Sequence, residues 1–351
     1  MTVKDQIIIV GGYGHVGSTI CRQLGALYPG KVYAAGRNFK RAEQLSTALN
    51  GQVKPMLLDI SAPVDPLLLT RVKLVVMCLD QEDSSFVRAC FQNGTHYIDV
   101  SASGSFLAEV EQMRDEAEEY GATAVLSVGL APGLTNLLAL QASKQLERTD
   151  SIDLTIMLGL GDRHGTAAIE WTVDQLSASF EVTENNRKVV VDSFTSGQIA
   201  DFGHEQGRKR AYRFPFSDQQ TLPHTLGVPS VATRLCFDSS VVTALVAGLR
   251  KSGLSRILRV PWVRNATVKC FNQFHFGEDR FAVTAKAKGR RAGIESTVEC
   301  MLHGRNQSDM TARVGAYVAH AICKSSYPSG VFHIEQLFEI KEMKTWLQQN
   351  A

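Results

Sequence analysis

A run of β-branched residues that leads into a glycine-rich turn constrains this chain more than any other feature. Residues 7–10 read Ile-Ile-Ile-Val and continue as GGYGHVG over residues 11–17, after which apolar residues recur at helical spacing. This strand, turn and helix predict the first turn of a dinucleotide-binding fold, in which Gly12 permits the tight turn, Gly14 lets the backbone approach a pyrophosphate and Gly17 lets the helix lie close to the strand. The residues expected to contact the cofactor here are Gly12, Tyr13, Gly14, His15, Val16 and Gly17.

The end of the second predicted strand indicates which dinucleotide binds. Strand 32–35 is followed closely by Arg37, where an NAD site would place Asp or Glu for the ribose 2′-hydroxyl. Arg37 predicts NADP instead, with NADPH preferred over NADH, because a guanidinium can form a forked pair of charge-assisted bonds with a 2′-phosphate. Asn38 is expected beside it. The alternative is that Arg37, Lys40 and Arg41 only solvate a helix start, where cations are mildly unfavourable unless an anion is bound.

Size and composition fit an ordinary globular protein with two domains. The 351 residues include 44% hydrophobic and 21% charged side chains, enough for a large core. A net charge of +2 and a pI near 8.1 give no indication of nucleic-acid or membrane binding, and no segment has the roughly 18 consecutive apolar residues of a membrane span. The seven cysteines are scattered and never spaced as CxxC, which favours reduced thiols and no metal site. With no targeting segment apparent, we expect a cytoplasmic protein.

The first part of the chain alternates strand-like and helical patterns, which predicts a parallel sheet covered by helices on both faces. After the first two strands, further strands are expected over residues 53–58, 74–77, 96–100 and 124–128. A helix starting near Asn38 and a longer one spanning residues 106–117 are expected between them. Six such strands predict an α/β fold with a doubly wound, Rossmann-type parallel sheet.

A change of pattern near residues 129–133 predicts a second domain inserted into the first. Strands of a mainly antiparallel sheet are expected over residues 152–158, 188–191, 267–276, 281–287 and 294–302, with a basic turn over 288–293. Helical stripes return over residues 314–322 and 337–347, and we expect both to pack on the first domain. The predicted division is an NADP-binding Rossmann domain of residues 1–130 and 310–351 and an inserted α+β domain of residues 131–309.

Residues that follow the strands are candidates for the site, because ligands of a doubly wound sheet lie beyond the carboxyl ends of its strands. Cys78 and Leu79 end the fourth strand and are expected to contact the nicotinamide through backbone and apolar groups. Asp59 and Ile60 end the third strand, where a carboxylate can accept a hydrogen bond from the adenine amino group. A role of Asp59 as a cap for the next turn is an equal alternative.

Asp99 and Ser101 follow the fifth predicted strand. A carboxylate there can stabilise a developing cation or orient a substrate amine, so Asp99 is a catalytic candidate and Ser101 a substrate-binding one. The alternative is that Asp99 caps the helix that starts near Gly104. His96 begins the same strand, away from the expected site, and is predicted to have a structural role.

Polar residues also gather in the second domain. Arg163 is a candidate substrate contact, and His164 is a candidate proton carrier because its unperturbed pKa lies near neutrality. The alternative is that Asp162 caps a helix and His164 packs against Trp171. Further along, Arg213 is a candidate clamp for a substrate carboxylate through a bidentate pair, or else a solvated strand residue.

Four segments, in this order, resemble the saccharopine dehydrogenase (saccharopine reductase) family: GGYGHVG at 11–17, GTHYIDVS at 94–101, GLAPGLTN at 129–136 and GVFHIE at 330–335. The resemblance covers most of the chain. It implies NAD(P)-dependent redox chemistry at a carbon that bears an amine, as in saccharopine reductase, carboxynorspermidine synthase and lysine dehydrogenases. It also implies that the inserted domain carries substrate contacts and dimerisation, so we expect a homodimer, and it favours Asn136 as a substrate contact over a helix cap.

The chain departs from the family in two respects. It is shorter than typical saccharopine reductases, which weighs against saccharopine itself as the substrate, and residues 161–171 match no characterised member. We expect an NADP-dependent oxidoreductase that reduces an imine or oxidises a C–N bond in a small amino acid derivative. A simple amino acid dehydrogenase and a non-catalytic NADP-binding sensor or scaffold are the alternatives. The polar residues Asp162, Arg163, His164 and Glu170 favour an enzyme, since a sensor has no need of them.

Overall fold

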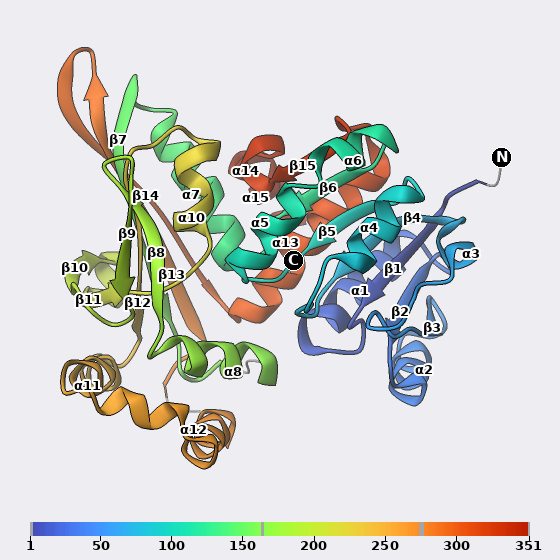
Figure 1. Cartoon of the computed structure of the whole chain (residues 1–351), viewed down its shortest axis with the longest axis horizontal. Helices are drawn as coiled ribbons and strands as arrows, with labels where there is room; N and C mark the ends of the chain where they lie inside the picture. The colour runs from blue at the N-terminus through green and yellow to red at the C-terminus, as the bar shows by residue number, and fades with distance from the viewer. Residues whose placement is uncertain (1–2, 163–164, 274–276, 350–351) are drawn as a thin grey trace. The chain divides into compact units, whose positions relative to one another are not determined.

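The computed structural model describes residues 3–162, 165–273 and 277–349 (Figure 1). The chain forms two compact units, one of residues 1–134 and 311–351 and the other of residues 135–310. Within the described ranges, no helix combines the length and the apolar character that crossing a bilayer requires.

The first unit is built on a parallel sheet with seven strands among the described residues, in the order β15-β6-β5-β4-β1-β2-β3. The strands are β1 Gln6–Val10, β2 Val32–Gly36, β3 Val53–Leu57, β4 Val72–Met77, β5 His96–Asp99, β6 Thr123–Leu126 and β15 Gly330–His333. The order reverses between β1 and β4, which is the switch point of a doubly wound fold. The predicted Rossmann-type sheet is therefore confirmed, and β15 is a further strand that the periodicity did not predict.

The position of each strand in the sheet follows from its sequence. Ile7, Ile8, Ile9 and Val10 of β1 are fully buried, as expected for a central parallel strand that is covered on both faces. At the edge, β3 is only partly buried and contains Pro55, which has no N–H to donate to a neighbouring strand.

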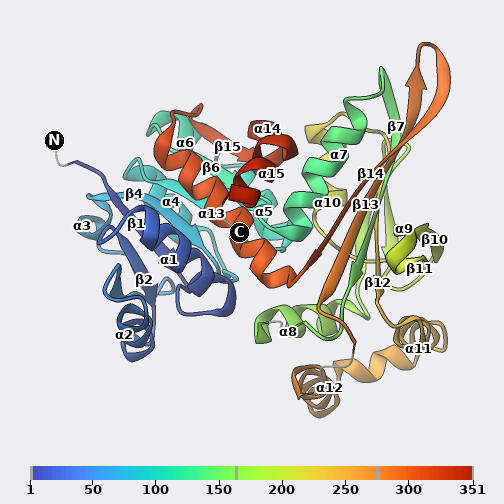
Figure 2. The ribbon, with the colours of Figure 1, turned by 180° about the vertical axis from the view of Figure 1, so that it is seen from behind.

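Helices cover both faces of this sheet. Helices α1 and α13 lie on one face (Figure 2) and α4 on the other (Figure 1). The helices of this unit are α1 His15–Leu27, α2 Phe39–Ala48, α3 Pro66–Leu69, α4 Ser85–Gln92, α5 Gly104–Glu111, α6 Arg114–Glu119, α13 Gln307–Lys324, α14 Ile334–Leu337 and α15 Ile340–Gln349. The helix predicted over 106–117 is broken into α5 and α6 at Gln112, although its apolar stripe is buried as expected. The stripe predicted over 337–347 is likewise interrupted, at Phe338.

The second unit is built on a mixed sheet, with six strands among the described residues in the order β10-β11-β12-β7-β13-β14. The strands of this unit are β7 Arg148–Leu158, β8 Ser179–Glu184, β9 Arg187–Asp192, β10 Gln198–Asp201, β11 Arg208–Arg213, β12 Val231–Phe237, β13 Arg280–Arg291 and β14 Ile294–Arg305. β7 and β12 are parallel, the other neighbours are antiparallel, and β8 pairs with β9 in a separate hairpin. The basic turn predicted over 288–293 is shorter than expected: it is made by Ala292 and Gly293, both with positive φ, and strands occupy the rest.

The helices of the second unit are α7 Thr135–Ser143, α8 Thr166–Gln175, α9 Gly203–Gln206, α10 Asp218–Thr225, α11 Ser240–Lys251, the 3₁₀ segment η2 Leu254–Arg259 and α12 Pro261–Gln273. The strand predicted over 267–276 is wrong for its described part, because residues 267–273 belong to α12; residues 274–276 lie outside the described ranges. Pro261 stands at the first helical position, where its missing N–H costs nothing. Val268 of α12 packs with Ile169 and Val173 of α8, which gives the helix its buried face.

Candidate functional site

The glycine loop, residues 11–17, joins β1 to α1 through contacts that only glycine permits. Gly11 has a φ of +75°, a left-handed conformation that favours glycine, and Gly12 lies in the same turn. A Cβ on Gly12 would lie 2.7 Å from the carbonyl oxygen of Ile9, and one on Gly17 would overlap the carbonyl oxygen of Gly11. Backbone therefore packs directly on backbone throughout the loop.

The first turn of α1 is open to a ligand. Its N-cap is Gly14, which has no side chain to accept from the helix amides, and the Gly14 N–H itself donates to the Gly11 carbonyl at 2.8 Å. The N–H groups of His15, Val16 and Gly17 belong to the first turn, where an α-helix provides no intrahelical acceptor. These amides and the positive end of the helix dipole suit a pyrophosphate. The residues present thus fit the phosphates of a dinucleotide.

The glycine loop is joined to the end of β2 through Tyr13. The hydroxyl of Tyr13 accepts a hydrogen bond from the backbone N–H of Asn38 at 3.0 Å, and the Asn38 side chain accepts from the Arg41 N–H at 3.1 Å as the N-cap of α2. The Arg41 guanidinium carbon lies 4.9 Å from the centroid of the Tyr13 ring. Arg37 is exposed and directly follows β2. Arg41 therefore contacts the tyrosine of the glycine loop, and Arg37 directly precedes Asn38, whose N–H the same tyrosine accepts.

The ends of β3 and β4 hold the remaining cofactor candidates. The Asp59 carboxylate accepts from the Ser61 N–H at 3.0 Å, which is the turn-capping role given as its alternative, while Ile60 packs partly buried on the core. The Leu79 side chain lies against Gly11, where a Cβ would come within 2.9 Å of it. Cys78 donates its backbone N–H to Val10 at 3.0 Å, and burial raises the pKa of its thiol to about 12. Its thiol is therefore protonated at neutral pH.

Asp99 lies at the centre of a buried polar cluster after β5. Its carboxylate accepts from the Ser101 N–H at 2.7 Å and from the Tyr97 hydroxyl at 2.5 Å, and Gln81 Nε2 donates to the same hydroxyl at 2.7 Å. Burial raises the pKa of Asp99 above its ordinary value. The carboxylate thus fixes the turn at Ser101 rather than the helix start near Gly104. Ser101 Oγ is enclosed and has no hydrogen-bond partner among the described residues.

Sequence reasoning missed several members of this edge of the sheet. Tyr97 and Gln81 complete the surroundings of Asp99, and His333 at the end of β15 places its Nδ1 2.8 Å from Ser127 Oγ at the end of β6. His333 stands in the 330–335 segment, whose likeness to the family was the one signal for it. His96 begins β5, and its Nδ1 accepts from the Thr123 N–H at 3.0 Å; burial lowers its pKa to about 4, in keeping with a structural role.

The polar residues predicted around 161–171 do not act as one group in the described part of the chain. Arg163 and His164 lie outside the described residues. The Asp162 carboxylate accepts from the N–H of Gln307 at 2.8 Å, so it caps the start of α13. Glu170 lies 3.9 Å from an Arg264 nitrogen on α12. Asp162 and Glu170 therefore do not help to distinguish an enzyme from a non-catalytic sensor.

Trp171 and Asn136 have packing partners within the second unit. The Trp171 ring lies 5.6 Å from Phe214 and 5.4 Å from Phe216, measured between centroids. Asn136 is fully buried in the first turn of α7, where its Oδ1 accepts from Thr135 Oγ1 at 3.3 Å.

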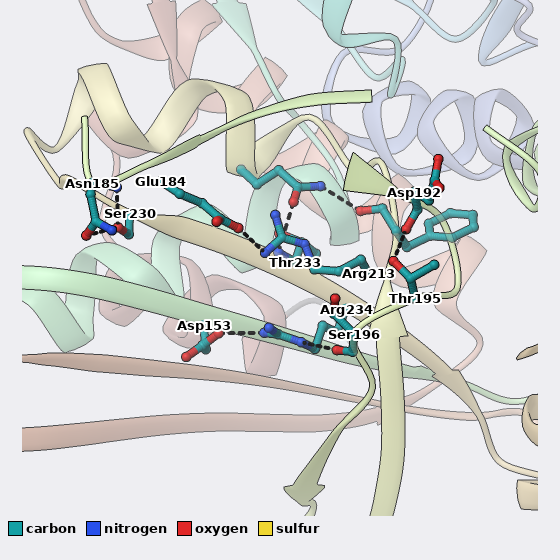
Figure 3. A network of polar contacts seen from close by, with 12 residues as sticks. Asp153, Glu184, Asn185, Asp192, Thr195, Ser196, Arg213, Ser230, Thr233 and Arg234 are labelled. Carbon is teal, nitrogen blue, oxygen red and sulfur yellow. Dashed lines mark hydrogen bonds and ion pairs between the residues drawn. The ribbon is translucent and has the colours of Figure 1, made fainter. Parts of the chain in front are cut away.

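Arg213 ends β11 and is buried rather than solvated. Its side chain is 4% exposed, and its Nη1 donates to Glu184 Oε1 at 3.2 Å (Figure 3). The solvated-strand alternative from the sequence is therefore wrong for this residue.

Comparison with known proteins finds a family model that matches most of the first part of the first unit. Residues 7–125 match the family described as saccharopine dehydrogenase NADP binding domain. Apo saccharopine dehydrogenase (L-Glu forming) from Saccharomyces cerevisiae has the same fold, with a TM-score of 0.67 and 11% identity over 98% of this chain and 96% of that one. No curated protein matches the sequence.

Two other solved structures are similar over most of both chains but at lower TM-scores. DAP dehydrogenase from C. glutamicum, in complex with DAP, has a TM-score of 0.44 and 14% identity over 98% of this chain and 99% of that one. Amine dehydrogenase from Mycobacterium smegmatis has a TM-score of 0.47 and 12% identity over 96% and 97%.

Proposed function

We propose that the chain is an NADP-dependent oxidoreductase that reduces an imine, or oxidises the corresponding C–N bond, in a small amino acid derivative. The match of residues 7–125 to the saccharopine dehydrogenase NADP binding domain supports the proposal. The observation that carries the proposal is the glycine loop. Its backbone packing leaves no room for a Cβ at Gly12 or Gly17, and its helix start presents amides without side-chain caps. Such a cradle has a clear use only when a phosphate occupies it.

The choice of NADP rests on Arg37 and Arg41. Arg37 follows β2 at the position where an NAD site carries an acid, and Arg41 is held over the Tyr13 ring. Cations at the start of α2 are mildly unfavourable by themselves, so an anionic 2′-phosphate between them is a favourable partner. NADPH is accordingly the preferred form over NADH.

The bound nicotinamide supplies the hydride, and the chain supplies alignment and charge. Leu79 and Cys78 provide an apolar surface beside the glycine loop, and the protonated thiol of Cys78 adds no charge there. Asp99 holds the turn that carries Ser101, whose unpartnered hydroxyl is the proposed substrate contact. The buried carboxylate of Asp99 favours an iminium over a neutral imine nearby. His164 as proton carrier, and Arg163 and Asn136 as substrate contacts, complete the proposal.

A binding measurement and a turnover assay test the proposal separately. Calorimetry with NADPH and NADH measures cofactor affinity, and loss of NADPH absorbance is followed with amino acids mixed with aldehydes. Turnover of an amine and aldehyde pair supports imine reduction, whereas turnover of an amino acid alone with NADP favours a simple dehydrogenase. Tight NADPH binding with no turnover on any mixture favours the sensor, and no binding of either nucleotide overturns the assignment.

The inserted domain, residues 131–309, is proposed to carry the substrate contacts and the interface of a homodimer. Light scattering of the purified chain measures its mass directly. A mass of one chain at assay concentration overturns the dimer and leaves the redox proposal standing.

A further inference from the structure

The second unit contains a small polar cavity that the cofactor does not account for. It has a volume of about 180 Å³ and is lined from β7, β8, β11, β12 and the turn between β8 and β9 (Figure 3). Its charged lining residues are Asp153, Glu184, Arg213 and Arg234. Ser151, Asn185 and Ser230 add hydroxyl and amide groups to the same walls.

Arg213 is the most unusual of these residues because most of its guanidinium has no partner. Its Nη1 contacts Glu184, but its Nε and Nη2 are enclosed and have no hydrogen-bond partner among the described residues. Burying a charged donor without an acceptor is costly, and native structures seldom leave such a group unmatched. Burial and the nearby charge of Arg234 also lower the pKa of Arg213. The Nε and Nη2 groups of Arg213 therefore lack a hydrogen-bond acceptor among the described residues.

The charged residues near Arg213 indicate which chemical group would supply its missing acceptor. Arg213 and Arg234 are register partners on β11 and β12, so two cations occupy directly opposed positions, where like charges are unfavourable. Arg234 is matched by Asp153 at 2.5 Å and by the Ser196 carbonyl at 3.5 Å (Figure 3). Arg213 has one contact at 3.2 Å, from a glutamate that is 44% exposed. Of the two arginines, Arg213 is therefore the one that still needs a carboxylate partner.

Asp153 and Glu184 exclude a simple anion as the best ligand. Two carboxylates on the same walls would repel phosphate or sulfate, but they suit an ammonium group. A ligand that carries one carboxylate and one ammonium can pair with both the arginines and the carboxylates that line the cavity. The volume, equal to about six waters at roughly 30 Å³ each, limits that ligand to a small molecule.

We propose that this cavity binds a free α-amino acid, with its carboxylate on the Arg213 guanidinium and its ammonium on Glu184 and Asp153. The seat for the carboxylate is the unpartnered, enclosed side of the Arg213 guanidinium. Glu184 uncovers it by exchanging its contact with Arg213 for one with the ammonium. The exposure of Glu184 allows that movement, because its side chain is not held by packing. The bound amino acid is either a substrate or an effector of the proposed redox reaction, and the experiment below distinguishes these two roles.

Binding is measured without turnover, by calorimetric titration of L-alanine, L-glutamate and L-lysine into the full chain. Propionate, which keeps the carboxylate of alanine and lacks its amine, is titrated in parallel. Arg213→Lys keeps the charge and removes the fork, and we expect it to weaken amino acid binding about tenfold or more. Arg250→Lys is the matched control, since Arg250 is a largely buried arginine of the same unit that pairs with Asp192 outside the cavity; it should bind as the wild type does.

Glu184→Gln tests the other half of the site and changes a half-exposed residue to one of the same shape, so we expect the chain to fold. It should weaken binding of the amino acids and leave propionate unchanged or tighter. Equal affinities in wild type and Arg213→Lys, or no binding of any of the three amino acids, would overturn the site. An unchanged ratio of amino acid to propionate affinity in Glu184→Gln would do the same.

The outcome for this site is distinguishable from that for the proposed redox function. Amino acid binding that Arg213→Lys weakens, together with a raised KM in the NADPH assay, identifies the bound molecule as a substrate. The same binding with an unchanged KM and an altered kcat identifies an effector. Amino acid binding in a chain that does not bind NADPH supports the cavity and overturns the redox proposal. NADPH turnover without amino acid binding at Arg213 supports the redox proposal and overturns the cavity site.

Discussion

The hydroxyl of Tyr13 accepts the backbone N–H of Asn38 at 3.0 Å. One residue of the glycine loop is thereby fixed to the segment after β2, between the basic residues Arg37 and Arg41. The same ring supports the guanidinium of Arg41 from 4.9 Å. The proposed phosphate cradle and the proposed 2′-phosphate contacts are therefore held in one arrangement by a single side chain.

Tyr13→Phe removes the acceptor and keeps the ring. We expect a loss of about 1 kcal/mol in the free energy of unfolding, typical of one hydrogen bond, and weaker binding of both NADPH and NADH because the loop is no longer tied to β2. Chemical denaturation and calorimetry measure the two effects. Tyr33→Phe, on β2 of the same unit, is the control, and an equal effect there would contradict the argument.

Arg37→Asp places an acid where an NAD site has one. NADPH binding should fall by at least about tenfold, because a charge-assisted fork is replaced by repulsion, while NADH binding changes little. The ratio of the two dissociation constants is the readout. Arg22→Asp on the exposed side of α1 makes the same change of net charge and should leave that ratio alone. Equal losses for both nucleotides in Arg37→Asp would remove Arg37 from the site.

Gly17→Ala adds a Cβ that overlaps the Gly11 carbonyl oxygen. We expect destabilisation of about 1 to 3 kcal/mol, as for other overpacked positions, together with loss of NADPH binding as α1 moves away from the loop. Gly248→Ala on α11 is the helical control, because no atom lies within 4 Å of its added Cβ. That variant should be as stable as the wild type or slightly more so. An unaffected Gly17→Ala would mean that the close packing is dispensable.

Asp99→Asn retains one oxygen acceptor in place of two. Both the Tyr97 hydroxyl and the Ser101 N–H need an oxygen, so one of them loses its partner, and the free energy of unfolding should fall by about 1 to 3 kcal/mol. If Asp99 also favours the iminium, kcat falls while the dissociation constant of NADPH stays constant. Asp59→Asn, at the end of β3, serves as the comparison and should leave kcat unchanged. A wild-type kcat in Asp99→Asn would restrict Asp99 to a structural role.

His96 makes stability depend on pH. Burial lowers its pKa from 6.5 to about 4, so the unfolded chain takes up a proton on His96 at a higher pH than the folded chain does. The free energy of unfolding therefore decreases as pH falls from about 6.5 towards 4, by up to about 3 kcal/mol from this residue. His96→Gln should flatten that slope relative to wild type in denaturation curves across this range. His204→Gln, at an exposed position, should retain the slope.

The parts of the fold that follow from local sequence were predictable, and those that depend on tertiary partners were not. Ile7 to Val10 and the glycines after them specify strand, turn and helix without outside help. Residues 267–273 alternate like a strand, yet they form α12 because Ile169 and Val173 on α8 provide a surface for one helical face. That surface is far away in sequence and cannot be read from a local period.

The candidate site shows the same division. The cofactor residues lie in short motifs whose spacing carries the information. By contrast, the partner of Asp162 is Gln307, which is 145 residues further along the chain, and the partner of Arg213 is Glu184 on a separate hairpin. Burial of Arg213 also depends on the fold of the second unit, and a single arginine in a sequence gives no sign of it.

Pro55 in β3 has a consequence for the protein in a crowded solution. An outermost strand with a complete row of amide donors invites the strand of another molecule, and this leads to fibrils or sheet-to-sheet aggregates. The pyrrolidine nitrogen interrupts that row in the middle of a five-residue strand. Pro55 thus protects this edge of the first unit's sheet against pairing with a strand of another molecule.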